Sequence, residues 1–150
     1  MTRDAPKPDG GVLAIDHGTK RTGFAVCDAL RLVTQPLDPW HGDGNSEVLV
    51  DHVAKLCEER TIATFLVGFP FNMDRSVGPR AAEVKAFADH LARRFPAVAI
   101  VLYDERLTTK AAEDLLREAG YHGLERKARR DSWSALVLLR DWIESGEPGR

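Results

Sequence analysis

The chain has 150 residues, of which 43% are hydrophobic and 29% are charged, and its formal net charge is −2. This length and composition indicate one soluble globular domain with a sizeable core, and no apolar run approaches the roughly 18 residues of a membrane span. The slightly negative charge does not by itself indicate a nucleic-acid-binding protein, since many such domains are basic overall.

The two ends of the chain are polar and contain Pro and Gly. Residues 1–10 lack the apolar core of a signal peptide, so we predict a disordered leader and expect the cytoplasm as the compartment. Residues 146–150 are expected to form a flexible tail, which leaves 11–145 as a single domain. Cys27 and Cys57 lie in apolar patterns without zinc-type spacing, which favours buried, reduced thiols.

Three strands are predicted near the N-terminus. An apolar run over 11–15 predicts a buried strand, and Thr22–Asp28 predicts a second strand that pairs with it as a hairpin. A third strand over Leu32–Leu37 is expected to be ended by Pro36 and Pro39, and residues 38–45 are predicted to be a loop.

The middle of the chain alternates between helix and strand. From Glu47 apolar residues recur at helical spacing, with Asn45 or Ser46 as the expected N-cap. Thr64–Phe69 predicts a fourth strand. A second amphipathic helix follows a loop and is expected to stop before Pro96.

The last third of the chain predicts one more strand and two helices. Ala97–Tyr103 is a continuous apolar run, as expected of a strand that is covered on both faces. A short helix is expected to end at Gly120, a basic loop to occupy 126–130, and a final helix to run over about Asp131–Glu144. This order predicts a mixed sheet with helices on both faces.

Three acids lie where predicted elements begin or end. Asp16 ends the first strand, either Asp104 or Glu105 ends the continuous strand, and Asp131 begins the last helix. Alternation places Asp104 and Glu105 on opposite faces and does not decide between them. Each acid also has a structural interpretation, namely a turn cap, a surface ion pair and a helix N-cap favoured by the helix dipole.

Taken together, the three acids point to metal-assisted cleavage of phosphodiesters. Two divalent cations about 3.5–4 Å apart can stabilise both the attacking and the leaving oxygen of a phosphodiester. Such hard cations prefer oxygen ligands, so an acidic set without histidine suits Mg²⁺ or Mn²⁺, bound as two ions, better than zinc. Candidate phosphate-binding residues are those of the turn after Asp16, Thr19, Lys20 and Arg21, and the basic cluster Arg126, Lys127, Arg129 and Arg130.

Four motifs resemble those of one known family. They are AIDHGTKRTGFAVCD (14–28), LVGFPFNMDRSVGPRA (66–81), YDERLTT (103–109), and the run from KARRD (127–131) through SALVLL (134–139). In their order and spacing, the chain resembles the YqgF or RuvX family, the pre-16S rRNA nucleases of the RNase H-like superfamily, over about residues 11–143.

The resemblance implies a fold and a site. It implies an RNase H-like α/β fold whose five-stranded sheet has the order 3-2-1-4-5, with the second strand antiparallel. It also implies that Asp16, Glu105 and Asp131 are the catalytic, metal-binding triad, and that Asn72, Arg106 and Thr109 are further substrate-binding positions. The chain departs from the family pattern at Arg75, Ser134 and His17; the histidine is expected to be solvated, with a proton-carrying role as the alternative.

Several functions remain open at this point. The resemblance implies cleavage of structured RNA at the 5′ end of the 16S rRNA precursor, in contact with a pre-ribosomal particle. The alternative is resolution of four-way DNA junctions, which requires a two-fold homodimer, although no dimer face is evident beyond the unassigned Trp40 and Trp133. A sugar kinase or actin-like ATPase also opens with an Asp-x-Gly-Thr turn but needs two such domains, and a non-catalytic RNA-binding module would not need the triad.

Overall fold

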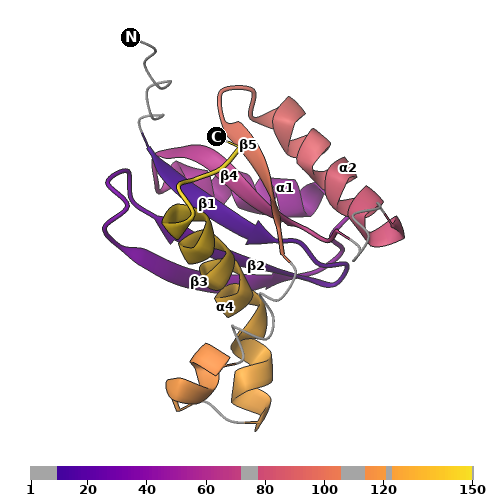
Figure 1. Cartoon of the computed structure of the whole chain (residues 1–150). Helices are drawn as coiled ribbons and strands as arrows, with labels where there is room; N and C mark the ends of the chain where they lie inside the picture. Colours follow the sequence, from indigo (N-terminus) through magenta and orange to yellow (C-terminus); the bar gives the residue numbers. More distant parts are fainter. Residues whose placement is uncertain (1–9, 72–77, 106–113, 121–122, 150) are drawn as a thin grey trace.

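The structure is a computed structural model that describes residues 10–71, 78–105, 114–120 and 123–149, with only the backbone described over 123–131. A helical turn also covers 114–118. The remaining elements are β1 (Gly11–Asp16), β2 (Arg21–Cys27), β3 (Thr34–His41), α1 (Glu47–Glu58), β4 (Ile62–Phe69), α2 (Pro79–Arg94), β5 (Ala99–Asp104) and α4 (Gly123–Glu144) (Figure 1).

The five strands form one mixed sheet in the order β3-β2-β1-β4-β5. β2 is antiparallel to both of its neighbours, whereas β1, β4 and β5 are parallel. This confirms the expected order and the antiparallel second strand of the RNase H-like fold. Because parallel strands share a direction, β1, β4 and β5 end at the same edge of the sheet, called the carboxyl edge below.

Helices cover both faces of the sheet (Figure 1). Side chains of β1 alternate between two clusters: Leu13 and Ile15 pack with α1 and α2, and Val12 and Ala14 pack with α4. Both clusters are fully buried at β1, so the central strand is a rigid support for whatever follows it. No helix in the described part of the chain is long and apolar enough to cross a membrane.

β3 begins and ends later than the sequence predicted. The Asp28 carboxylate accepts hydrogen bonds from the backbone N–H groups of Leu32 and Val33, each at 2.8 Å, and this turn delays the strand to Thr34. β3 then continues through both of its prolines, because it is the edge strand and a missing N–H there need not interrupt a ladder. The prediction of a loop over 38–45 is therefore wrong as far as His41.

β5 differs from its prediction in burial. The apolar run suggested a strand covered on both faces, yet β5 is the other edge strand and only Val101 is buried. Ile100 and Leu102 pack partly against the α1 and α2 side, and Tyr103 packs partly on the α4 side. The apolar run reflects partial cover from both layers.

α4 begins earlier than predicted. The expected basic loop over 126–130 is helical, and the helix begins at Gly123, about two turns before Asp131. Lys and Arg have high helix propensity, which a loop assignment from charge alone overlooked. Asp131 is therefore not a helix N-cap, and the dipole argument for that alternative does not apply to it.

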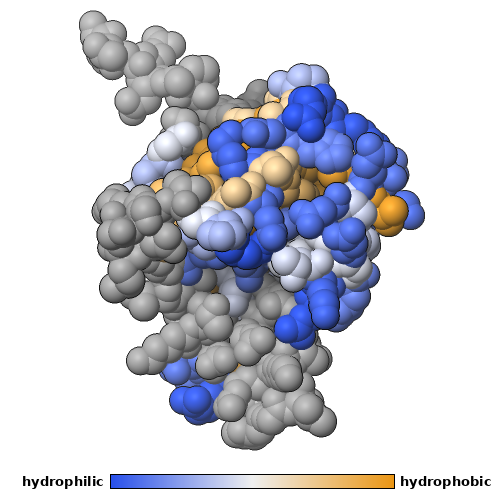
Figure 2. All heavy atoms as spheres, turned by 90° about the vertical axis from the view of Figure 1, so that its right-hand side faces the viewer, coloured by the Kyte–Doolittle hydropathy of each residue, from blue (hydrophilic) through white to orange (hydrophobic). Residues whose placement is uncertain are grey.

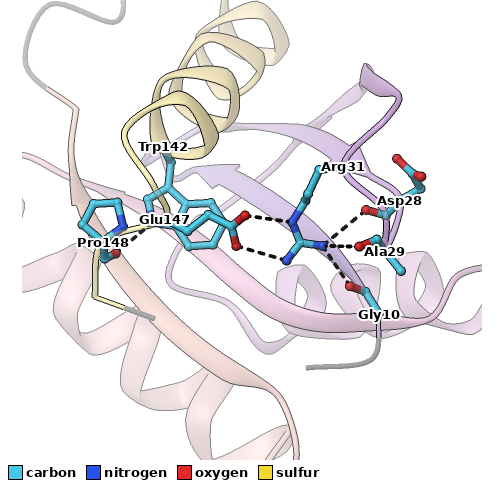
Figure 3. Close-up of polar contacts among 7 residues, drawn as sticks. All are labelled: Gly10, Asp28, Ala29, Arg31, Trp142, Glu147 and Pro148. Atoms are coloured by element: carbon cyan, nitrogen blue, oxygen red, sulfur yellow. Dashed lines mark hydrogen bonds and ion pairs between the residues drawn. The ribbon is translucent and has the colours of Figure 1, made fainter. Parts of the chain in front are cut away.

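The residues after α4 pack against the rest of the domain. Residues 146–149 therefore do not form the flexible tail that was expected. The Arg31 guanidinium forms a two-pronged ion pair with Glu147, at 3.3 Å for both contacts, and donates at 3.1 Å to the Gly10 carbonyl (Figure 3). The indole of Trp142 donates to the Pro148 carbonyl at 2.9 Å. We call the ion pair the Arg31–Glu147 clasp; its side chains are only 8% and 5% exposed.

Two groups of residues that lacked a role in the sequence are packing residues. Trp40 is half-buried against the core beside His52, and Trp133 is half-buried against the cluster under α4. Both cysteines are free thiols, as predicted; Cys27 is buried, whereas Cys57 is only half-buried.

Candidate catalytic site at the carboxyl edge

Two of the three predicted acids meet at the carboxyl edge. Asp16 is the last residue of β1, and Glu105 directly follows β5. The backbone N–H of Glu105 donates to the carbonyl of Phe69, the last residue of β4, at 3.2 Å. The side chains of Asp16 and Glu105 are hydrogen-bonded to each other, so the two acids converge over the end of the strand that lies between them.

Gly68 makes room for this convergence. A Cβ atom at position 68 would lie 2.8 Å from Oε2 of Glu105 and 3.3 Å from Cδ2 of Leu138 in α4. The Glu105 carboxylate therefore lies against the backbone of β4, on the side of the sheet that α4 covers. No local sequence pattern marks Gly68 as a site residue, since its role depends on a contact with a residue 37 positions away in the chain.

Burial raises the pKa of the Glu105 carboxyl, and the nearby charge of Asp104 raises it further, while the contact with Asp16 and the charge of Arg80 act in the opposite direction. Two carboxyl groups in hydrogen-bonding contact must share a proton unless a cation is present. A divalent cation is the chemically natural replacement for that proton, because both groups offer hard oxygen ligands. The pair therefore fits a Mg²⁺ or Mn²⁺ site.

His17, the residue after Asp16, is buried, and the expectation of a solvated side chain is wrong. Its ring stacks on Phe87 of α2 with centroids 4.5 Å apart, and its Nε2 lies 2.7 Å from the Gly44 carbonyl. Burial lowers the pKa of His17, and the charge of Arg80 lowers it further. A neutral, packed imidazole is a structural support for the end of β1.

The turn after Asp16 is held by the loop that follows β3. Gly44 N–H donates to the Thr19 carbonyl and Gly42 N–H to the Lys20 carbonyl, both at 2.9 Å. A Cβ on Gly18 would lie 1.9 Å from the Arg21 carbonyl oxygen, so only glycine fits the turn. Thr19 and Lys20 are exposed and Arg21 is half-buried, which leaves the first two accessible beside Asp16.

The other predicted site residues are only partly covered by the structure. Asn72, Arg106 and Thr109, like Arg75, lie outside the described residues, as do the side chains of Asp131 and the basic cluster Arg126, Lys127, Arg129 and Arg130. Within the described residues no group of three or more His, Cys, Asp or Glu side chains is placed to hold a metal. The third acid of the triad thus stays a prediction.

An apolar groove of about 570 Å³ adjoins the carboxyl edge. Phe69, Phe71 and Leu102 line its sheet side, and Ala86 of α2 lines the other. On the face that carries α2, apolar surface lies exposed among hydrophilic side chains (Figure 2). The Phe69 carbonyl accepts the hydrogen bond from Glu105, so the groove reaches the carboxyl edge, but on the face of the sheet opposite to the Glu105 carboxylate.

Comparison with known proteins places the chain among nucleases. A profile of the RuvX family, described as Holliday junction resolvase, matches residues 10–145. The "Putative pre-16S rRNA nuclease" of Halalkalibacterium halodurans is 39% identical over 133 residues, which are 88% of this chain and 94% of that protein. Proteins of the same name from Acetivibrio thermocellus and Mycobacteroides abscessus are 35% and 33% identical, over 89% and 95% of this chain and 95% and 89% of theirs.

Solved structures with the same fold include two proteins in complex with Holliday junctions. RuvC of T. thermophilus in complex with Holliday junction substrate superposes with a TM-score of 0.58 at 15% identity, over 92% of this chain and 97% of that one. The Fowlpox virus resolvase in complex with Holliday junction DNA gives 0.57 at 11% identity, over 90% and 97%. At such low identity the likeness establishes the fold.

Proposed function

The chain belongs to the RuvX family, and from that premise we propose that it is a metal-dependent nuclease that hydrolyses phosphodiester bonds of a structured nucleic acid at its carboxyl edge. The observation that carries the proposal is the contact between the carboxyl groups of Asp16 and Glu105 at the ends of two parallel strands. Two half-buried carboxylates in contact repel each other unless a cation compensates their charge, so the pair suits metal binding.

Asp16, Glu105 and Asp131 would hold the metal, preferably as two Mg²⁺ or Mn²⁺ ions. When bound, these ions activate water and stabilise the charge that develops on the phosphate. Glu105 is oriented by its backbone hydrogen bond to Phe69 and by contact with Gly68. Asp16 is oriented by its position at the end of a fully buried strand.

The assignment of Asp131 as third ligand rests on the family motif and on the course of α4. Glu105 lies on the side of the sheet that α4 covers, beside Leu138. Asp131 precedes Leu138 by two turns on that helix, and three of the four buried positions between them, Ser132, Ser134 and Ala135, are small. Small residues there let the helix backbone approach the carboxyl edge closely.

The natural substrate that we propose is the 5′ end of the 16S rRNA precursor, within a pre-ribosomal particle in the cytoplasm. The names of the curated relatives, at up to 39% identity, support this choice. The second candidate is a four-way DNA junction, which the family description and the resolvase complexes support. Resolution would additionally require a two-fold homodimer to place two cuts.

The test compares both substrates with one enzyme preparation. Wild-type protein with Mg²⁺ or Mn²⁺ is incubated with a precursor-rRNA 5′ end and with a four-way DNA junction, and the products are mapped at nucleotide resolution. We expect cleavage of the RNA at a defined position that is absent in Asp16→Asn. Paired, symmetric cuts in the junction together with an intact RNA would favour the second candidate, and cleavage of neither substrate would contradict the nuclease proposal.

A further inference from the structure

Arg80 in the first turn of α2 lies beside the paired acids, and its side chain is held from two sides. Its Nη1 donates to Glu83 at 2.8 Å, and its Nη2 donates to Nδ1 of His17 at 3.1 Å and to the His17 carbonyl. His17 directly follows Asp16, so the guanidinium is tied to the backbone next to the first acid. The positive charge of Arg80 also lowers the pKa of Glu105, the second acid.

The partners of His17 determine its tautomer. The Gly44 carbonyl can only accept a hydrogen bond, so Nε2 of His17 must carry the proton. Arg80 can only donate, so Nδ1 must offer its lone pair. The neutral imidazole therefore accepts a hydrogen bond from Arg80 and carries no positive charge that would repel the guanidinium. Stacking on Phe87 fixes the plane of the ring. Arg80 is thus anchored by rigid groups, in contrast to an arginine on a free surface.

The anchored guanidinium of Arg80 still has an N–H group that can donate a hydrogen bond to a ligand. Among the described residues its hydrogen bonds use only Nη1 and Nη2, and the side chain is 36% exposed. Within the described part of the chain, the Nε–H group is thus left to donate to a ligand. An exposed arginine with one surface carboxylate partner would lose entropy on binding a ligand, whereas Arg80 is already ordered.

We propose that Arg80 is a further substrate-contacting catalytic residue, whose guanidinium binds a non-bridging oxygen of the phosphate that is cut, with His17 and Glu83 as its positioning residues. The inference rests on the proposed nuclease function. Arginine suits this role because its planar fork matches phosphate oxygens and keeps its proton at any working pH. A fixed donor at a phosphate whose charge increases in the transition state accelerates cleavage.

Binding is measured first, with Ca²⁺ in place of Mg²⁺ and with fluorescein-labelled probes: an RNA hairpin with a 5′ single-stranded extension, and a four-way DNA junction. Arg80→Ala is compared with Arg94→Ala, a matched control on the same helix, whose arginine is 46% exposed and paired with Asp51. We expect Arg80→Ala to weaken binding about tenfold and to reduce the slope of log affinity against log salt by about one. The control should change neither.

Turnover gives the second readout. Arg80→Ala should lower kcat about a hundredfold, and added guanidinium chloride at non-denaturing concentration should restore part of the loss. Arg80→Lys should recover the salt slope, because the charge is kept, but not kcat, because the fork is lost. A merely structural brace would not respond to free guanidinium.

The inference and the proposed function fail in different ways. If Arg80→Ala binds both probes with the affinity and salt slope of Arg94→Ala, the phosphate contact is overturned, even where wild-type protein cleaves. A lower melting temperature with unchanged binding would likewise make Arg80 a brace between β1 and α2 and overturn it. If wild-type protein cleaves nothing, the nuclease function fails, and the binding comparison still decides the role of Arg80.

Discussion

Asp16 follows five fully buried residues of β1, so its backbone position does not depend on its own charge. Replacing Asp16 by Asn keeps its volume and removes one metal ligand charge. We expect cleavage to fall at least about a hundredfold at saturating Mg²⁺, since the metal supplies several kcal/mol of transition-state stabilisation. Circular dichroism should be unchanged. The exposed Asp38→Asn serves as the control, and near-normal turnover of Asp16→Asn would remove it from the site.

Gly68 allows a test of the geometry of Glu105 that leaves every charge in place. In Gly68→Ala the new methyl group would lie 2.8 Å from Oε2 of Glu105, so the carboxylate must move. We expect kcat to drop about tenfold or more, because small displacements at a catalytic site are costly. Gly120→Ala is the control: the residue has φ of 91° and nothing within 4 Å of its added Cβ. It should lose stability while keeping activity.

The burial of the single residue His17 could not be predicted from the sequence. Its burial depends on Phe87, Arg80 and Gly44, which lie 27 to 70 positions away in the chain, so no local pattern announces it. Asp16 and Glu105, by contrast, were predictable as candidates because each ends an apolar run. Choosing Glu105 over Asp104 required the family motif, since alternation alone was neutral.

At the scale of elements, those with a clear local signal were predicted well. α1 begins at Glu47 and α2 ends before Pro96, as predicted, and β4 ends at Phe69 as predicted but begins two residues earlier, at Ile62. β3 and β5 were misjudged because their limits depend on being at the sheet edges, which is a property of the assembled sheet. α4 was misjudged at its start because a run of positive charge was interpreted as a loop.

The backbone of 126–130 is helical, so the basic cluster, Arg126, Lys127, Arg129 and Arg130, belongs to α4 and not to a loop. We expect substitution of all four by Ala to weaken binding of nucleic acid and to make its salt dependence shallower, since fewer counterions are released. Anisotropy titrations over a range of salt concentrations measure both. The double Ala variant of Arg93 and Arg94, at the far end of α2, removes two positive charges outside the cluster and measures how much a change in net charge alone affects binding. An unchanged slope would exclude the cluster from the binding surface.

At the scale of the whole molecule, metal binding should appear as stability. A ligand that binds only the folded state stabilises it by about 2.7 kcal/mol at a hundredfold excess over its dissociation constant. Mg²⁺ or Mn²⁺ should therefore raise the melting temperature of the wild type, and less so in Asp16→Asn. Calcium should stabilise as well. If no divalent ion shifts the wild-type transition, the acids do not bind metal in the free protein.

The Arg31–Glu147 clasp joins residues 116 positions apart, and this separation has a kinetic consequence. Contacts between such distant segments close late in folding, because the loop entropy must be lost before they form. The clasp should therefore not yet be formed in the rate-limiting transition state of folding. Breaking one partner of a buried pair costs about 3 kcal/mol, so Glu147→Gln should unfold about a hundredfold faster and refold at the wild-type rate. Stopped-flow chevron plots would reveal this, and slower refolding would show that the C-terminal end docks early. If the clasp does close last, it sets the lifetime of the folded protein while leaving the time needed to reach it unchanged.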